Sequence, residues 1–206
     1  MDNFEACLPA TKGFTLFYGH TKGPQRIFSN FFPSPLTDPS LYPGVEELQP
    51  YRDPKGAVAF EHVEQYMHAL KAIVFNDFDT LEKIMKQGSD PLTAKRLGRV
   101  VKDYEEDVWQ SAARPIVTRG CVLKFGQSDP LGEELERTGS SMLVECAPRD
   151  RRWGVGLGVD NPRATQPGQW RGTNWLGQCL VLARRHLREG TMEELPRLAW
   201  KMDHSK

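Results

Sequence analysis

The apolar and polar positions change their spacing about one third of the way along the chain. Residues 14–36 carry aromatic and β-branched residues between glycines and prolines, which predicts short strands and turns, including one at 28–32. Residues 57–60 read as a further strand. Between them, the proline-rich segment 37–56 is predicted to be a long exposed loop or insertion.

After residue 61, apolar residues recur three and four positions apart, which predicts a series of helices. Asp77 and Asp90 are the predicted N-caps of two helices that end near Gly88 and Gly98. The remaining expected elements are helices over 63–72, 103–125, 129–137 and about 176–187, a strand over 142–147, and a loop over 153–172. The predicted fold class is therefore α+β, a single helix-rich domain with a small sheet. We expect this domain at 14–188, between tails at 1–13 and 189–206, the second loose or a peripheral helix.

Composition narrows the possible partners. The 206 residues suit one sizeable domain, and the 27 basic residues equal the 27 acidic ones. Zero net charge argues against a broad electrostatic hold on nucleic acid, although a local basic patch stays open. No apolar run approaches the roughly 20 residues of a membrane span, and no signal peptide is recognisable at the start. We therefore expect no membrane partner and a location in the cytoplasm or the nucleus.

The cysteines do not suggest a metal site. Cys7, Cys121, Cys146 and Cys179 are far apart and form no CxxC pair. Four reduced, mostly buried thiols are expected instead, and no metal.

The helix expected at 63–72 has two contrasting faces. Its apolar face is formed by Val63, Tyr66, Met67, Leu70 and Val74. Its other face gathers Glu61, Glu64, His68 and Lys71. A solvated face of this kind gains only about 0.2–0.5 kcal/mol per charge pair. The alternative is that the carboxylate, the imidazole and the amine face a ligand together.

Three other clusters allow two interpretations each. The segment 29–32 is either a strand with a turn or part of a site. The glycines of 153–156, after Asp150, suit either a tight turn or a close approach to a ligand. The segment 170–177 opens the last helix, where Thr173 or Asn174 caps the helix or its N-terminus holds an anion.

In order, these segments resemble one family. The resemblance is carried by 29–31, 63–67, 71–72, 95–99, Trp109, 124–125, 138–139, 143–145, 150–156 and 174–177. Together they are similar to the NADAR domain, the YbiA-like family of N-glycosidases, over about residues 14–188. The Glu-Gln-Tyr-Met form of residues 64–67 resembles the eukaryotic branch. The segment 37–56 is longer than in compact members.

The resemblance implies hydrolysis of an N-glycosidic bond to a phosphorylated ribose, without a cofactor. The substrates it suggests are early riboflavin-pathway intermediates, or ADP-ribose attached to guanine bases of DNA or RNA. The expected partners are ADP-ribose or a phosphoribosyl small molecule and ADP-ribosylated nucleic acid, bound by a monomer. Two other classes stay open: a non-catalytic ADP-ribose or nucleotide reader, and an interaction domain that uses 37–56.

Chemistry assigns roles to the candidate residues. Cleavage of the bond builds positive charge on the ribose, which a carboxylate stabilises while a carboxylic acid protonates the departing base. Glu64 and Asp150 are the candidates for these roles. Lys71 either forms a Schiff base with the opened ribose or remains charged and holds phosphate. The candidate substrate-binding residues are Ser29, Asn30, Phe31, Tyr66, Arg99, Trp109, Lys124, Trp153 and Asn174. Trp109 and Trp153 stack on a base or sugar, or else belong to the core.

Overall fold

A computed structural model describes residues 13–42 and 44–196. Its helices are α1 (Val63–Val74), α2 (Phe78–Lys86), α3 (Pro91–Arg99), α4 (Glu106–Gly126), α5 (Asp129–Arg137) and α6 (Trp175–Glu189). Its strands are β1 (Phe14–Phe17), β2 (Leu36–Asp38), β3 (Val58–Phe60) and β4 (Met142–Glu145). Short 3-10 helices cover Pro24–Phe28, Glu46–Tyr51, Pro162–Thr165 and Pro167–Gln169.

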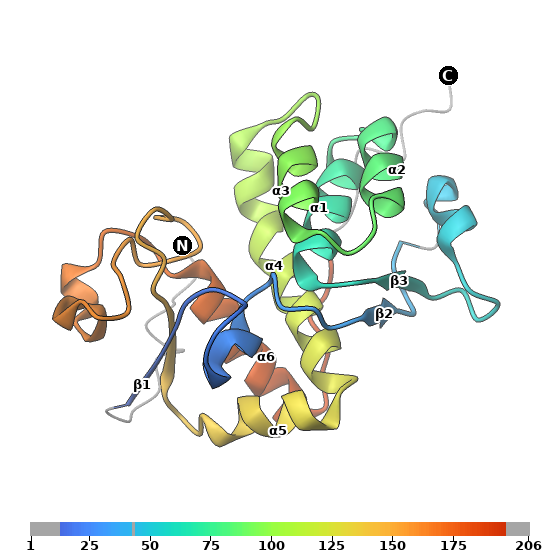
Figure 1. The fold of residues 1–206 in the computed structure, drawn as a ribbon. Helices are drawn as coiled ribbons and strands as arrows, with labels where there is room; N and C mark the ends of the chain where they lie inside the picture. Colours follow the sequence, from blue (N-terminus) through green and yellow to red (C-terminus); the bar gives the residue numbers. More distant parts are fainter. Residues whose placement is uncertain (1–12, 43, 197–206) are drawn as a thin grey trace.

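Helix α4 lies at the centre of the molecule (Figure 1). Helix α1 packs against one part of it and α6 against another, while α2 and α3 pack on α1. The predicted helix at 103–125 begins instead at Glu106, because Asp103 adopts a left-handed conformation with φ of 50°. The α+β prediction is confirmed, and α1 has neighbours on several sides.

The strands form two separate pairs in place of one small sheet. β1 runs parallel to β4, with Phe14 opposite Met142, and β2 runs antiparallel to β3, with Leu36 opposite Phe60. Every residue of β4 is buried, and the strand ends at Glu145. The first pair therefore delivers the chain from β4 directly into the turn that contains Asp150.

The strand predicted at 28–32 is wrong. Pro24 opens a 3-10 helix that ends at Phe28, because proline suits the first helical position. Residues 29–32 then form a turn, in which Ser29 Oγ accepts a hydrogen bond from the Phe31 amide at 3.2 Å. This local side-chain bond competes with strand pairing.

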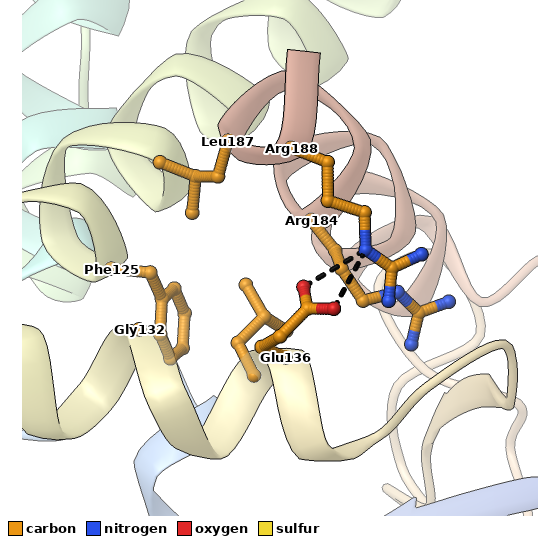
Figure 2. Close-up of a pocket in the computed structure, with 7 residues that line it drawn as sticks. Phe125, Gly132, Glu136, Arg184, Leu187 and Arg188 are labelled. Carbon is orange, nitrogen blue, oxygen red and sulfur yellow. Dashed lines mark hydrogen bonds and ion pairs between the residues drawn. The ribbon is translucent and has the colours of Figure 1, made fainter. Parts of the chain in front are cut away.

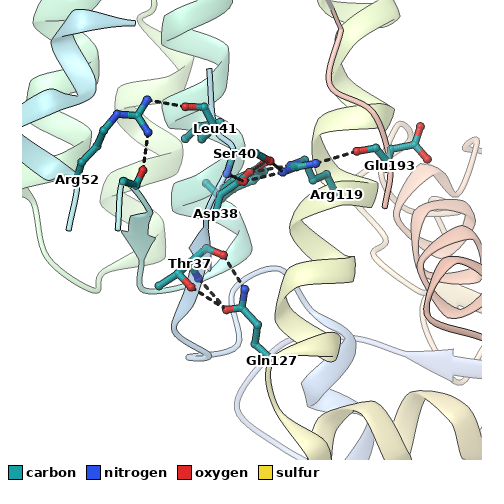
Figure 3. Close-up of polar contacts among 10 residues, drawn as sticks. Thr37, Asp38, Ser40, Leu41, Arg52, Arg119, Gln127 and Glu193 are labelled. Carbon is teal, nitrogen blue, oxygen red and sulfur yellow. Dashed lines mark hydrogen bonds and ion pairs between the residues drawn. The ribbon is translucent and has the colours of Figure 1, made fainter. Parts of the chain in front are cut away.

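The segment 37–56 is packed onto the domain, contrary to the prediction of an exposed loop. Leu41, Val45 and Leu48 are buried in the main core. The guanidinium of Arg52 donates to the carbonyl oxygens of Leu41, Tyr42 and Gly56 and so ties the segment together (Figure 3). Apolar residues spaced among prolines explain why the segment folds inward.

A buried ion pair joins this segment to the centre of the fold. Asp38 is fully buried and accepts two hydrogen bonds of 2.7 Å from Arg119 of α4 (Figure 3). Tyr66 of α1 donates its hydroxyl to the same carboxylate at 2.8 Å. Arg119 also donates to the Glu193 carbonyl, so residues after α6 are attached to the domain. This network fixes α1 relative to α4.

The two ends of the chain are not described. Residues 1–12 and 197–206 lie outside the described residues, and so does Cys7. Cys121, Cys146 and Cys179 are free and buried, as expected. Within 13–42 and 44–196, no helix combines the length and apolar character needed to cross a bilayer.

Candidate active site

Most of the predicted polar face is enclosed: Glu64 and His68 are buried and Lys71 is half-buried, whereas Glu61, before α1, is exposed. The interpretation as a solvated face is therefore wrong for Glu64 and His68. Glu64 is 4% exposed and His68 7%. His68 Nε2 lies 3.1 Å from Glu64 Oε1. A carboxylate only accepts, so the imidazole donates from Nε2. The other carboxylate oxygen, Oε2, makes no hydrogen bond or ion pair with any described residue.

Gly98 of α3 contacts the side chains of both His68 and Lys71. A Cβ at position 98 would overlap the imidazole ring of His68. The Gly98 carbonyl accepts a hydrogen bond of 2.8 Å from Lys71 Nζ. Sequence analysis placed Gly98 only at a helix end, because its two contacts come from α1, a different element.

Lys71 sits among aromatic rings. Its Nζ lies 4.2 Å from the centre of the Tyr104 ring and 5.6 Å from that of Trp109. Burial lowers the pKa of Lys71 to about 8, with Arg152 lowering it further and Glu106 opposing. A part of the amines is therefore uncharged near neutral pH, which suits nucleophilic attack. Trp109 is itself buried, so its visible role is to enclose this amine.

Asp150 organises the turn after β4. Its Oδ1 accepts from the amides of Arg152, at 2.9 Å, and Trp153, at 2.8 Å. The half-buried Trp153 ring packs edge-on against Trp175, with centroids 5.6 Å apart. A Cβ at Gly154 would press on the carbonyl oxygens of Glu145 and Asp150, so the glycine permits a close backbone approach. The turn therefore holds Asp150 close to the end of β4.

Glu145 is the residue that sequence analysis missed. It is 8% exposed at the end of β4. Burial raises the pKa of Glu145 to about 8, with Asp150 and Glu64 raising it and Lys95 lowering it. Carboxyl groups from α1, from β4 and from the following turn therefore act on one another. The signal that identifies Glu145 is its raised pKa, which arises from contacts that exist only in the folded protein.

The segment 29–31 borders this cluster. The Asn30 carbonyl accepts from the Glu64 amide at 3.1 Å. Lys124 is buried, and its Nζ donates to the carbonyls of Ile27, at 2.6 Å, and Ser29, at 2.9 Å. Burial lowers the pKa of Lys124 to about 8. The structure thus gives Lys124 a visible role in supporting the loop that carries Ser29, Asn30 and Phe31.

Two other predicted binding residues are buried and bonded to groups within the fold. Tyr66 is fully buried and bonded to Asp38. Asn174 is 1% exposed, accepts from the Glu145 amide at 3.0 Å and donates to the Leu143 carbonyl at 2.9 Å. Its side chain makes no capping bond to α6 and instead anchors β4. The capping interpretation is therefore wrong for Asn174.

A basic cleft opens beside α3. It has a volume of about 440 Å³ and is lined by Phe31, Asp90, Leu92, Lys95, Arg96 and Arg99. Lys95 Nζ lies 5.4 Å from the centre of the Phe31 ring. Since Lys95 also acts on Glu145, the cleft adjoins the carboxyl cluster. Its cations and its ring suit a phosphate-bearing ligand.

A second hollow lies between α5 and α6 (Figure 2). Its two arginines are engaged: Arg188 pairs with Glu136, and Arg184 donates to the Ser141 carbonyl. In the described part of the chain, no group of three His, Cys, Asp or Glu side chains could hold a metal ion.

Comparisons with known proteins agree with the family resemblance found in the sequence. The family model of the NADAR domain matches residues 16–188. Protein irg-1 of Caenorhabditis elegans is 34% identical over 179 residues, which are 86% of this chain and 81% of that protein. N-glycosidase R617 of Acanthamoeba polyphaga mimivirus is 34% identical over 176 residues, 84% of this chain and 96% of that protein. The NMR structure of Escherichia coli YbiA matches with a TM-score of 0.63 at 23% identity, over 97% of this chain and 93% of that one. The YbiA structure supports the fold, and the family match together with the similarity to N-glycosidase R617 supports a glycosidase-type activity.

Proposed function

Because this chain belongs to the NADAR domain family, we propose that it hydrolyses an N-glycosidic bond between a base and a phosphorylated ribose. The observation that carries the proposal is the interaction of Glu64, Asp150 and the buried Glu145, with Lys71 on the same polar face of α1 as Glu64. A module that only binds a nucleotide has no need for several partly buried carboxyl groups, whose burial costs stability. Such groups with a perturbed pKa cluster at catalytic sites.

In this proposal, Glu64 stabilises the positive charge that develops on the ribose. Its Oε1 is held by His68, while its Oε2 stays available to the substrate. Asp150 is held by two backbone amides and orients the attacking water. Lys71 either attacks the anomeric carbon or holds a phosphate.

The basic cleft supports a phosphorylated substrate. Lys95, Arg96 and Arg99 outnumber the single acidic residue, Asp90, that lines it. A volume of about 440 Å³ falls in the range of small-molecule sites. Two substrates meet these requirements: ADP-ribose on a guanine base of nucleic acid, and a phosphorylated ribosylamino intermediate of riboflavin synthesis.

One assay separates the enzyme from a reader. The protein is incubated with an ADP-ribosylated guanine oligonucleotide and, separately, with the ribosylamino pyrimidine phosphate of the riboflavin route, and the products are separated by chromatography with mass detection. The proposal expects free base or free ADP-ribose from at least one substrate. Binding of ADP-ribose with release from neither substrate supports the reader and contradicts the enzyme.

A further inference from the structure

The carboxyl group of Glu145 is buried and has no hydrogen-bond or ion-pair partner among the described residues. Its backbone is fixed on both sides, since its amide donates to Asn174 Oδ1 at 3.0 Å and its carbonyl accepts from the Val155 amide at 2.9 Å. Among the described residues, no side chain or amide donates a hydrogen bond to its carboxyl oxygens, and no cation pairs with them. The carboxyl oxygens of Glu145 are not completely buried, so they keep contact with solvent.

The neighbours of Glu145 favour its neutral form. Glu64 approaches from α1 and Asp150 from the turn after β4, and both repel a negative charge at position 145. Lys95 of α3 has the opposite effect and favours the ionised form. Burial adds the cost of removing a charge from water.

The three carboxyl groups differ in their hydrogen-bond donors. Glu64 receives a bond from His68, and Asp150 receives bonds from two amides of its own turn. Bonds from donors stabilise the ionised form of a carboxyl group. Glu145 has none among the described residues, so its ionised form is not stabilised in this way.

We propose that Glu145 is the general acid of this site and passes its proton to the departing base. This inference rests on the proposed function. The C–N bond breaks with its electron pair leaving on the base nitrogen, and that nitrogen takes the proton of Glu145. The anomeric carbon then bonds to a water oxygen, either directly or after hydrolysis of a Lys71 adduct, and the proton that the water loses restores Glu145. The carboxylate of Glu64 stabilises the ribosyl cation.

The first test uses leaving groups of different basicity. Glu145→Gln keeps the shape of the side chain but cannot donate an acidic proton. With a purine or pyrimidine N-glycoside, we expect a loss of about 10²–10⁴-fold in kcat, the usual contribution of a general acid. With 4-nitrophenyl ribofuranoside 5-phosphate, whose nitrophenolate leaves without a proton, we expect a much smaller loss. Equal losses on both substrates overturn the inference.

Controls keep this comparison interpretable. Glu133→Gln, at an exposed ion pair of α5, is expected to keep wild-type rates on both substrates. Glu145→Asp retains a carboxyl group and is expected to recover part of the lost N-glycosidase rate. Thermal unfolding of each variant identifies any that does not fold.

A pH titration tests whether Glu145 carries the proton, and it needs no turnover of substrate. Glutamates carrying ¹³C at Cδ are followed by NMR as the pH is raised, and the signal missing in Glu145→Gln is assigned to Glu145. We expect a midpoint near 8, where its pKa lies. A midpoint in the ordinary range of glutamate overturns the inference even if the protein is active. If the wild type cleaves no N-glycoside, the proposed function fails, and the titration still decides whether Glu145 holds the proton.

Discussion

His68 Nε2 donates a hydrogen bond of 3.1 Å to Glu64 Oε1 across one turn of α1. The other imidazole nitrogen, Nδ1, is buried and has no partner among the described residues. It packs against Gly98, where any Cβ would overlap the ring. The ring is therefore held in one orientation, and Glu64 is oriented through it.

Gly98→Ala tests this arrangement. The added methyl group displaces His68 and with it the Glu64 carboxylate, so we expect kcat to fall by roughly 10²-fold, the cost of about 1 Å of misplacement. Steady-state kinetics measures this fall. Gly168→Ala, at an open position, is the matched control and is expected to be neutral. A Gly98→Ala enzyme with wild-type kcat contradicts the role of the contact.

Lys71 makes a covalent route testable. Burial lowers the pKa of its amine to about 8, so the fraction of uncharged, nucleophilic amine rises as the pH passes through 8. During turnover with borohydride, we expect a reduced ribosyl adduct on Lys71, identified by peptide mass spectrometry, with a yield that rises over the same pH range. Lys83→Arg, on α2, is expected to leave the adduct unchanged.

The opposite result assigns Lys71 to phosphate binding. Absence of an adduct at every pH, together with a Lys71→Arg variant that keeps most of its activity, leaves water as the nucleophile. The amine then stays protonated near the ligand.

Activity is expected not to depend on a metal ion. Neither the cysteine spacing nor the described side chains provide a metal-binding group. We expect full activity after exhaustive chelation with EDTA, measured as release of base. Activity that disappears with EDTA and returns with one divalent ion contradicts this prediction.

The buried ion pair predicts a large effect on stability. Asp38→Asn removes a buried charge and leaves Arg119 without its partner. We expect the free energy of unfolding to fall by about 3–5 kcal/mol, measured by urea denaturation. Asp79→Asn breaks an exposed pair with Lys102 and is expected to have little effect. Equal effects of the two substitutions would show that the buried pair is not what fixes α1.

Local signals explain which elements were predictable. Asp77 and Asp90 accept from amides of the first turns of α2 and α3, as their positions in the sequence indicated. The helix predicted at 129–137 has those bounds in the structure. Capping and periodicity act within a few residues, so sequence alone reveals them.

The site depends on contacts between distant elements, which sequence periodicity does not report. Glu64 and His68 looked solvated because the packing of other helices around α1, which buries them, is not visible in the sequence. Glu145 looked like one more residue of a short buried strand, since its acidic neighbours come from α1 and from a turn. Asn174 looked like a cap, but a left-handed backbone with φ of 54° turns its side chain toward β4. The family resemblance suggested the reaction, whereas the arrangement of the site residues became visible only in the folded structure.

The most direct test of the account is to compare the wild type with Glu64→Gln in hydrolysis and in ADP-ribose binding. The apolar face of α1 is untouched by this substitution, so we expect a folded protein that still binds ADP-ribose in calorimetry. We predict that the wild type releases free base and that the variant retains less than about a hundredth of its rate. A variant with more than about a tenth of the wild-type rate would contradict the claim that Glu64 is at the centre of an N-glycosidase site.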